Sequence, residues 1–291
     1  VQAVASPYRD RSHFDGQDVL ENGGADVGRL RDGWLNRALL PLGGSLGAEV
    51  AIAMAQNTPL VLRGENSVTS WAPSRLPDAD ASTLRRLGDL YADDDFFASR
   101  LAQALRSQAI AGGDGSSGRG DDVTDAAEAA AKFLTVEDGP RIAVIEASGW
   151  DTHANQGAST GQLANRLAGL DAGIATLRTG LGETWDDTVV AIVTEFGRTV
   201  HINGTRGTDH GTAGAALLVG GAVHGGRVIA DWPGLSRKNL HEGRDLRPVT
   251  DLRAVFKAVL GEHLGLDAGY IEQTVFPDSG SARGLEDLIR V

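Results

Sequence analysis

Residues 141–153 read RIAVIEASGWDTH, an apolar, strand-like run that leads into an aspartate and a histidine. A second apolar run, residues 188–195, reads TVVAIVTE and ends in a glutamate. Between them, residues 162–181 carry Leu and Ile at three- and four-residue spacing, which predicts an amphipathic helix. Strand, helix and strand in this order predict right-handed crossovers on a mostly parallel sheet. The chain is therefore expected to be an α/β protein.

Four side chains able to bind a metal stand beside these runs and beside a third one at 215–219: Asp151, His153, Glu195 and His210. In an open α/β sheet, ligands bind outside the carboxyl ends of the strands, so these side chains are expected to meet. Carboxylate and imidazole groups suit a divalent cation such as zinc, calcium or manganese. Each residue also has an ordinary explanation, such as a capping Asp, a surface His or a salt bridge. These residues form three groups along the sequence, Asp151 with His153, then Glu195, then His210. Each group stands at the same kind of sheet edge, and together they favour a metal site.

Other polar residues could complete such a site. Arg9, Arg11 and Arg198 could present paired donors to a tetrahedral anion, although exposed salt bridges are the commoner role of arginine. Ser12 stands at a predicted helix start, where the helix dipole favours negative charge; the alternative is a plain N-cap. A metal-bound histidine usually bonds a carboxylate through its other nitrogen, and Asp209 or Glu146 could supply one.

Composition restricts the possible partners. The net charge of −12 argues against nucleic acid or an anionic membrane, although a local basic pocket could still hold one small anion. The absence of cysteine excludes thiolate zinc sites and cysteine nucleophiles. No apolar stretch is long enough to span a bilayer. The α/β alternation resumes after the Gly-rich segment 112–121, so we expect one domain over 1–291 with a flexible loop at 112–121.

A competing motif predicts a different enzyme. Residues 43–47 read GGSLG, which matches the nucleophile elbow of α/β-hydrolases with Ser45 as nucleophile. The elbow requires a strand before it and a helix after it. A helix at 48–55 is plausible, but residues 34–40 also read as helix where a strand is needed. A serine esterase is therefore the weaker alternative.

Five motifs together resemble one known family: SPYRDRSHFD at 6–15, GWLNR at 33–37, GWDTH at 149–153, TEFGRT at 194–199 and DH at 209–210. The pattern is similar to the uncharacterised bacterial domain-of-unknown-function family 1501, placed in the alkaline phosphatase and sulfatase superfamily. The resemblance implies an alkaline-phosphatase-like three-layer sandwich with a mostly parallel central sheet. It also implies export by the twin-arginine route, to the periplasm or the cell exterior.

The activity implied by the resemblance is metal-dependent hydrolysis of phosphate or sulfate esters, with a small anionic ester as substrate. The implied roles are Ser12 as nucleophile, Asp151, His153, Glu195 and His210 as metal ligands, and Arg9 or Arg198 as the anion clamp.

Two departures from the superfamily favour a rival function. Its Asp-His dipeptide appears here as Glu195-Phe196, so one imidazole ligand is missing. The chain also lacks a counterpart of the family's N-terminal segment, which carries the first strand and an acidic ligand. These departures favour a non-catalytic binding or assembly protein that kept the fold. A missing strand would expose a sheet edge, which we expect a partner or a dimer to cover.

Overall fold

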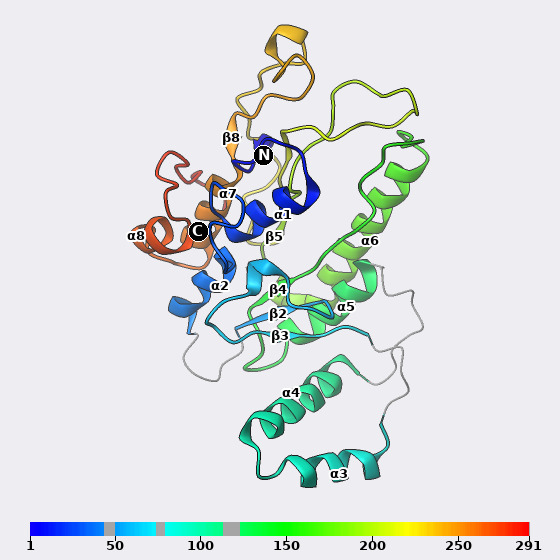
Figure 1. Ribbon diagram of the computed structural model, residues 1–291, viewed down its shortest axis with the longest axis vertical. Coiled ribbons are helices and arrows are strands. Elements are labelled where there is room, and N and C mark those ends of the chain that lie inside the picture. Colours follow the sequence, from blue (N-terminus) through cyan, green and yellow to red (C-terminus); the bar gives the residue numbers. More distant parts are fainter. Residues whose placement is uncertain (44–49, 74–78, 113–122, 291) are drawn as a thin grey trace.

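The computed structural model describes residues 1–43, 50–73, 79–112 and 123–290. Its α helices are α1 (His13–Asn22), α2 (Trp34–Leu39), α3 (Ala81–Tyr91), α4 (Asp95–Ala111), α5 (Val123–Leu134), α6 (Gln162–Leu181), α7 (Leu252–Ala258) and α8 (Ala268–Tyr270). Its strands are β1 (Gln2–Ala5), β2 (Ala51–Ala53), β3 (Thr69–Ser70), β4 (Ile142–Val144), β5 (Val190–Ile192), β6 (Gly214–Ala215), β7 (Leu217–Val219) and β8 (Thr250–Asp251). Figure 1 shows their arrangement, with the α3–α4 pair projecting from the rest of the molecule. No helix in the described ranges combines the length and the hydropathy needed to cross a membrane.

The strands form three small sheets, in the orders β6-β1-β8, β3-β2-β4 and β5-β7. Only the sheet of β3, β2 and β4 is entirely parallel. The expected crossover from β4 to β5 within one sheet is wrong, because β5 pairs antiparallel with β7. The chain turns back after β5, which sets Val190 opposite Val219 and leaves β4 paired with β2. The protein is thus a mixed α/β fold in which a parallel sheet is one part.

Strand β1 lies in the middle of its sheet. It pairs antiparallel with β6 on one side and parallel with β8 on the other. The amino group of Val1 also donates a hydrogen bond to the carbonyl of Ala216 at 2.8 Å. The first residues of the chain are therefore joined to segments more than 200 positions away, and they carry α1 to the same place.

Two clusters of buried side chains hold the elements together. One centres on Trp34 of α2, whose ring lies 4.5 Å from that of Phe256 and 5.2 Å from that of Phe276. The other packs the alanine-rich helix α5 between Ile52 of β2 and Leu177 of α6. Alanine side chains let helices approach closely, so α5 and α6 pack side by side (Figure 1). This second cluster supports the loop between β4 and α6, which carries Asp151 and His153.

The nucleophile-elbow motif falls largely on residues 44–47, which lie outside the described residues, as does most of the loop expected at 112–121. The helix expected at 48–55 is wrong where the structure describes it. Residues Ala51–Ala53 form strand β2, buried on both faces between β3 and β4, because three apolar residues with a β-branched isoleucine at their centre fit the middle of a parallel sheet.

Candidate metal centre

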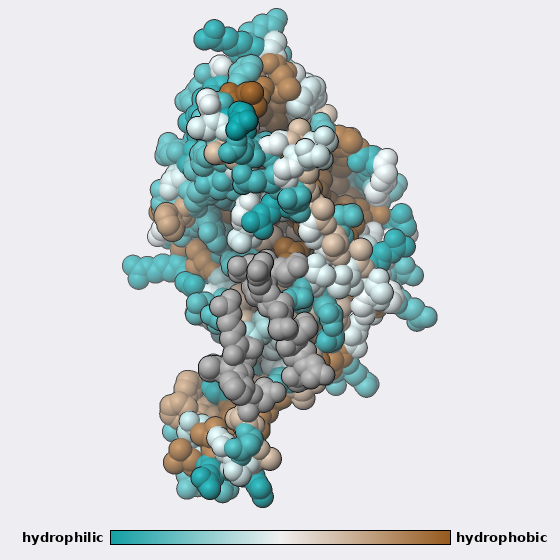
Figure 2. All heavy atoms as spheres, turned by 90° about the vertical axis from the view of Figure 1, so that its right-hand side faces the viewer, coloured by the Kyte–Doolittle hydropathy of each residue, from teal (hydrophilic) through white to brown (hydrophobic). Residues whose placement is uncertain are grey.

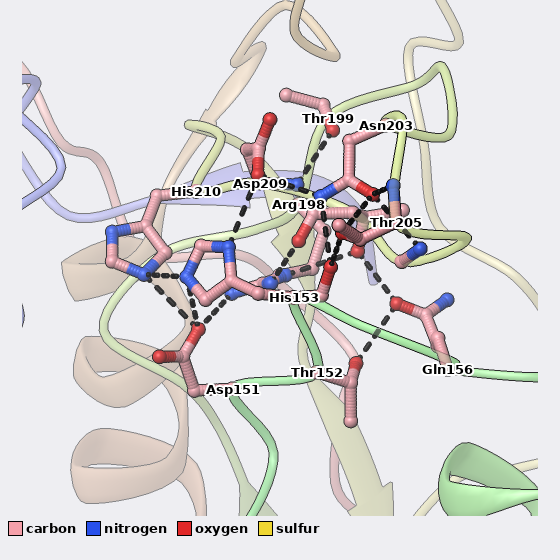
Figure 3. A network of polar contacts seen from close by, with 12 residues as sticks. Asp151, Thr152, His153, Gln156, Arg198, Thr199, Asn203, Thr205, Asp209 and His210 are labelled. Carbon is pink, nitrogen blue, oxygen red and sulfur yellow. Dashed lines mark hydrogen bonds and ion pairs between the residues drawn. The ribbon is translucent and has the colours of Figure 1, made fainter.

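The carboxylate of Asp151 lies against the imidazole side chains of His153 and His210 (Figure 3). Its Oδ1 atom is 2.9 Å from Nε2 of His153 and 3.0 Å from Nε2 of His210. These two Nε2 atoms are themselves 2.9 Å apart. His13 approaches the other carboxylate oxygen, with its Nε2 atom 3.3 Å from Asp151 Oδ2. Ligand atoms around a tetrahedral zinc ion stand about 3.3 Å apart, because each bond is about 2.0–2.1 Å long. The spacing of the cluster is close to that of a coordination sphere.

The orientation of the three imidazoles is fixed by contacts on the side of each ring that faces away from Asp151. Each places its Nδ1 atom against an oxygen: His13 against Glu195 Oε1 at 2.6 Å, His153 against Asp209 Oδ1 at 3.0 Å, and His210 against the carbonyl of Arg11 at 2.8 Å. An oxygen acceptor requires the proton on Nδ1, which leaves the lone pair of each Nε2 atom facing the cluster. Metal-binding histidines in proteins are held in this way.

His13 gives the clearest sign of a missing partner. Its Nε2 atom is buried and accepts or donates no hydrogen bond among the described residues, since the 3.3 Å approach to Asp151 lacks hydrogen-bond geometry. A buried polar atom without a partner is unfavourable unless an ion or water satisfies it. His13, Asp151 and His210 each offer one ligand atom, and these atoms lie within 4.8 Å of one another. The donor set fits a divalent cation.

The surroundings keep Asp151 ionised. Partial burial opposes ionisation, but it is outweighed by interactions of which the hydrogen bond from Arg198 is the largest, so the pKa of Asp151 falls to about 2. The Nη1 atom of Arg198 lies 2.5 Å from Asp151 Oδ1, and its Nε donates to Thr208 Oγ1 at 3.1 Å. The carboxylate is therefore charged and available as a ligand at neutral pH.

Glycines bring the loops of the site together. A Cβ atom on Gly207 would stand 2.2 Å from the backbone of His153, and one on Gly211 would stand 2.6 Å from the backbone of Arg198. Both distances are far below a normal contact, so the chain can approach this closely only where the side chain is absent. Residues Arg198 and His210 form an antiparallel bridge next to this contact.

A family model described as a protein of unknown function (DUF1501) matches residues 2–275. The chain belongs to the DUF1501 family. The matched range includes the whole cluster, from His13 to His210. The membership expected from the sequence motifs is thereby confirmed, while the family description assigns no activity. Searches of curated proteins and of solved structures found no match.

In this DUF1501 chain, Glu195 lies behind His13 and not beside Arg198, as a salt bridge would require. Asp209, and not Glu146, supplies the carboxylate behind His153. His13 itself is the ligand candidate that sequence reasoning missed. The sequence offered one indication: His13 directly follows Ser12, the proposed nucleophile, at the start of a predicted helix. Its separation of 138 positions from Asp151 hid their proximity in the fold.

Two predicted residues stay outside the contacts of the cluster. Ser12 occupies the N-cap position of α1, but its side chain makes no capping bond there and has no other hydrogen-bond partner among the described residues. The plain N-cap explanation therefore does not account for its hydroxyl. Arg9 donates to the carbonyls of Ser6 and Tyr8 in its own turn. Burial lowers the pKa of Arg9, against the attraction of Asp251.

Phe196 closes one side of the DUF1501 cluster. Its buried ring lies 4.9 Å from the ring of His13 and 4.9 Å from that of His210. An added Cβ on Gly16 would meet the same ring at 3.2 Å, so α1 packs closely against it. Phe196 thus positions two imidazoles and excludes water from behind them, without being able to bind a metal.

Proposed function

We propose that this DUF1501 chain is a metal-dependent hydrolase of phosphate or sulfate esters. The observation that carries the proposal is the convergence of three Nε2 lone pairs on one ionised carboxylate, each imidazole being held by an oxygen on its Nδ1 atom. Without a cation between them, the facing lone pairs of His153 and His210 repel each other. An alkaline-phosphatase-like three-layer sandwich and export from the cytoplasm belong to the same proposal.

His13, Asp151, His153 and His210 would hold the ion. Three imidazoles and one carboxylate favour zinc, whereas calcium and manganese prefer a set richer in oxygen. When bound, such an ion polarises an ester oxygen and lowers the pKa of a coordinated hydroxyl or water. Glu195 and Asp209 would orient the imidazoles, as carboxylates behind metal-bound histidines do.

The residues around the ion would contribute the remaining chemistry. Ser12 directly precedes His13, and its hydroxyl is free of partners among the described residues, so we assign it the role of nucleophile. Its place at the N-terminus of the ten-residue helix α1 favours the negative charge that develops on attack. Arg198, bound to Asp151, lies where it can neutralise an anionic substrate. Arg9 remains the second candidate for that clamp.

The rival function, a metal-binding protein without catalysis, is favoured by a specific observation. Phe196 fills the position next to Glu195 where the superfamily has an imidazole, and it is buried against His13. A second ion of the kind that assists phosphoryl transfer would lack this ligand.

Metal content measured by elemental mass spectrometry, on protein purified without chelator or histidine tag, tests the first half of the proposal. We expect near-stoichiometric zinc, lost in His13→Ala and retained in His201→Ala, because His201 is exposed and outside the cluster. A folded wild-type protein without any metal would overturn the proposal.

Hydrolysis of p-nitrophenyl phosphate and p-nitrophenyl sulfate tests the second half. Chelation should abolish the activity, and Ser12→Ala should reduce kcat by at least about 10³-fold, as loss of a nucleophile does. Stoichiometric metal without hydrolysis of any ester in a wider screen would select the rival function. Full activity in Ser12→Ala would remove Ser12 from the mechanism.

A further inference from the structure

Helices α3 and α4 form a hairpin that projects from the body of the protein (Figures 1 and 2). No residue of α3 is buried, and α4 buries only Ser107 and Ala111, near the end that meets α5. Each helix nevertheless begins at an aspartate whose carboxylate accepts two backbone N–H groups, Asp80 for α3 and Asp94 for α4. Such caps stabilise each helix locally, without contacts from a partner.

The hairpin exposes large apolar side chains that a helix of a soluble protein normally buries. Leu84, Leu87 and Leu90 follow the spacing of one helix face. The most exposed large apolar residues of the hairpin are Leu90 at 72%, Phe96 at 63%, Phe97 at 49% and Leu105 at 36%. Phe97 stacks on Tyr91 at 5.2 Å, which organises the aromatic rings into one patch. Contiguous apolar patches of this kind mark interaction surfaces, and Figure 2 shows apolar colour on the projecting part.

The charge of the hairpin differs from that of the rest of the chain. Residues 80–111 contain four arginines and five aspartates, a net charge of −1, so the remainder of the −12 chain carries −11. Two copies of this acidic protein repel each other least where their hairpins meet. The electrostatic repulsion that opposes binding of a second copy is therefore lower at the hairpin than at the rest of the protein.

The charges of the hairpin are also segregated along it. The turn between the helices is acidic, with Asp89 and Asp93 to Asp95, whereas the four arginines lie along the helices away from the turn, at 85, 86, 100 and 106; Asp80 caps the open end of α3. None of these arginines forms an ion pair within the described part of the chain. Two hairpins placed side by side in opposite directions would set the arginines of each against the aspartates of the other. The hairpin is thus complementary to a second copy of itself.

We propose that the α3–α4 hairpin is a homodimer surface, on which two copies pack their apolar faces into an antiparallel four-helix bundle. A twofold axis gives each copy the same contacts, as in most protein dimers. Short antiparallel helices joined by a tight turn are the units from which such bundles form. This proposal is independent of the metal centre, because no residue of the hairpin belongs to the cluster.

Sedimentation analysis of the full chain over a range of concentrations tests the proposal. We expect a reversible dimer whose Kd rises by at least about tenfold in Leu90→Ser, because a buried leucine is lost from the interface. Ile202→Ser is the matched control: Ile202 is 76% exposed, lies outside the hairpin, and its loss should leave the Kd unchanged. Metal content measured on the same samples should be equal in both variants, which separates this outcome from that of the proposed function.

Charge reversal tests the antiparallel arrangement. Arg85→Glu with Arg86→Glu should abolish the dimer, and so should Asp89→Arg with Asp93→Arg, because each places like charges opposite each other. Mixing the two variants should restore a dimer, since both contacts then join opposite charges. A wild-type monomer at every concentration, or a dimer that Leu90→Ser does not weaken, would overturn the proposal. Binding of the monomeric wild type to lipid vesicles, lost in Leu90→Ser, would also overturn it and assign the patch to a membrane.

Discussion

His153 and His210 face each other with their Nε2 atoms 2.9 Å apart, although each holds its proton on the opposite nitrogen. Two lone pairs at this distance repel unless a cation or a proton lies between them. The acceptors behind the rings, Asp209 and the carbonyl of Arg11, prevent either ring from relieving the repulsion by changing its tautomer. The arrangement is therefore one that a metal ion stabilises.

Asp209→Ala should weaken metal binding by about 10- to 100-fold, the usual effect of removing a carboxylate behind a metal-bound histidine. The physical reason is the loss of the acceptor on His153 Nδ1. Titration with zinc against a competing chelator measures the change. Asp287→Ala is the matched control, because Asp287 accepts from His224 at the same 3.0 Å but lies outside the cluster. Equal affinity in the two variants would contradict a role for Asp209 behind a ligand.

Gly207→Ala should destabilise the protein by about 1–3 kcal/mol, as overpacking does, and should lower its metal content. The added methyl group would stand 2.2 Å from the backbone of His153 and push that ligand out of place. Gly204→Ala in the same loop meets nothing within 4 Å and should be neutral. Urea unfolding and elemental analysis of both variants check the prediction, which fails if Gly207→Ala keeps wild-type stability.

Arg11→Met should lower the free energy of unfolding by about 3–5 kcal/mol, because it removes the nearer cation from the buried carboxylate of Asp245 and leaves it the more distant Arg244, whose Nε atom lies 3.6 Å from Oδ1. Arg11 Nε lies 2.7 Å from Asp245 Oδ2, and the Asp245 side chain is fully buried. Arg29→Met removes a comparable ion pair with Asp278 at the exposed surface and should change the stability by less than about 1 kcal/mol. Urea unfolding curves for the two variants should therefore differ clearly; similar midpoints would show that the buried pair contributes little.

Glu146→Gln should raise the thermal stability at pH 7 and leave it unchanged in acid. Glu146 is exposed, but partial desolvation of its carboxyl, with the nearby charge of Glu21, raises its pKa above 4.5, while Arg63 opposes the shift. The folded state thus holds this proton more tightly than the unfolded state, and the resulting stabilisation is complete below pH 4.5 and lost as the pH rises through the folded pKa.

Thermal unfolding of Glu146→Gln at several pH values measures the effect, with Glu137→Gln as the control at another exposed glutamate. A Glu146→Gln protein that is less stable than the wild type at pH 7 would contradict the assigned direction.

Local patterns were enough to predict some of the separate elements, although not β2 (Ala51–Ala53), for which a helix was expected. The helix expected at 162–181 is α6 (Gln162–Leu181), because the spacing of its apolar residues depends only on the helix itself. Strand pairing was not predictable in the same way. The partner of β5 is decided by the course of the chain between Val193 and Ala216, which returns β7 beside β5, and no periodicity records that return.

The residues of the candidate site also divide into those that local sequence predicts and those that only the fold brings together. Asp151 and His153 could be predicted from the sequence because they stand two residues apart after an apolar run. His13 carried no such signal, since it reaches Asp151 only because β1 delivers α1 to a distant part of the fold. The role of Asp209 over Glu146 likewise depended on which loop folds against His153.

The central place of β1 has a consequence for the synthesis of the protein. Its two neighbours, β6 and β8, begin more than 200 residues after β1, so β1 waits unpaired for roughly 10–50 s when about 5–20 residues are synthesised per second. During that time α1 and the His13 imidazole that it carries cannot reach their contacts with Asp151 and Glu195. The protein therefore completes its candidate site only after His210 and β6 have left the ribosome, and a nascent chain stalled before them would lack both the pairing of β1 with β6 and the full set of candidate metal ligands.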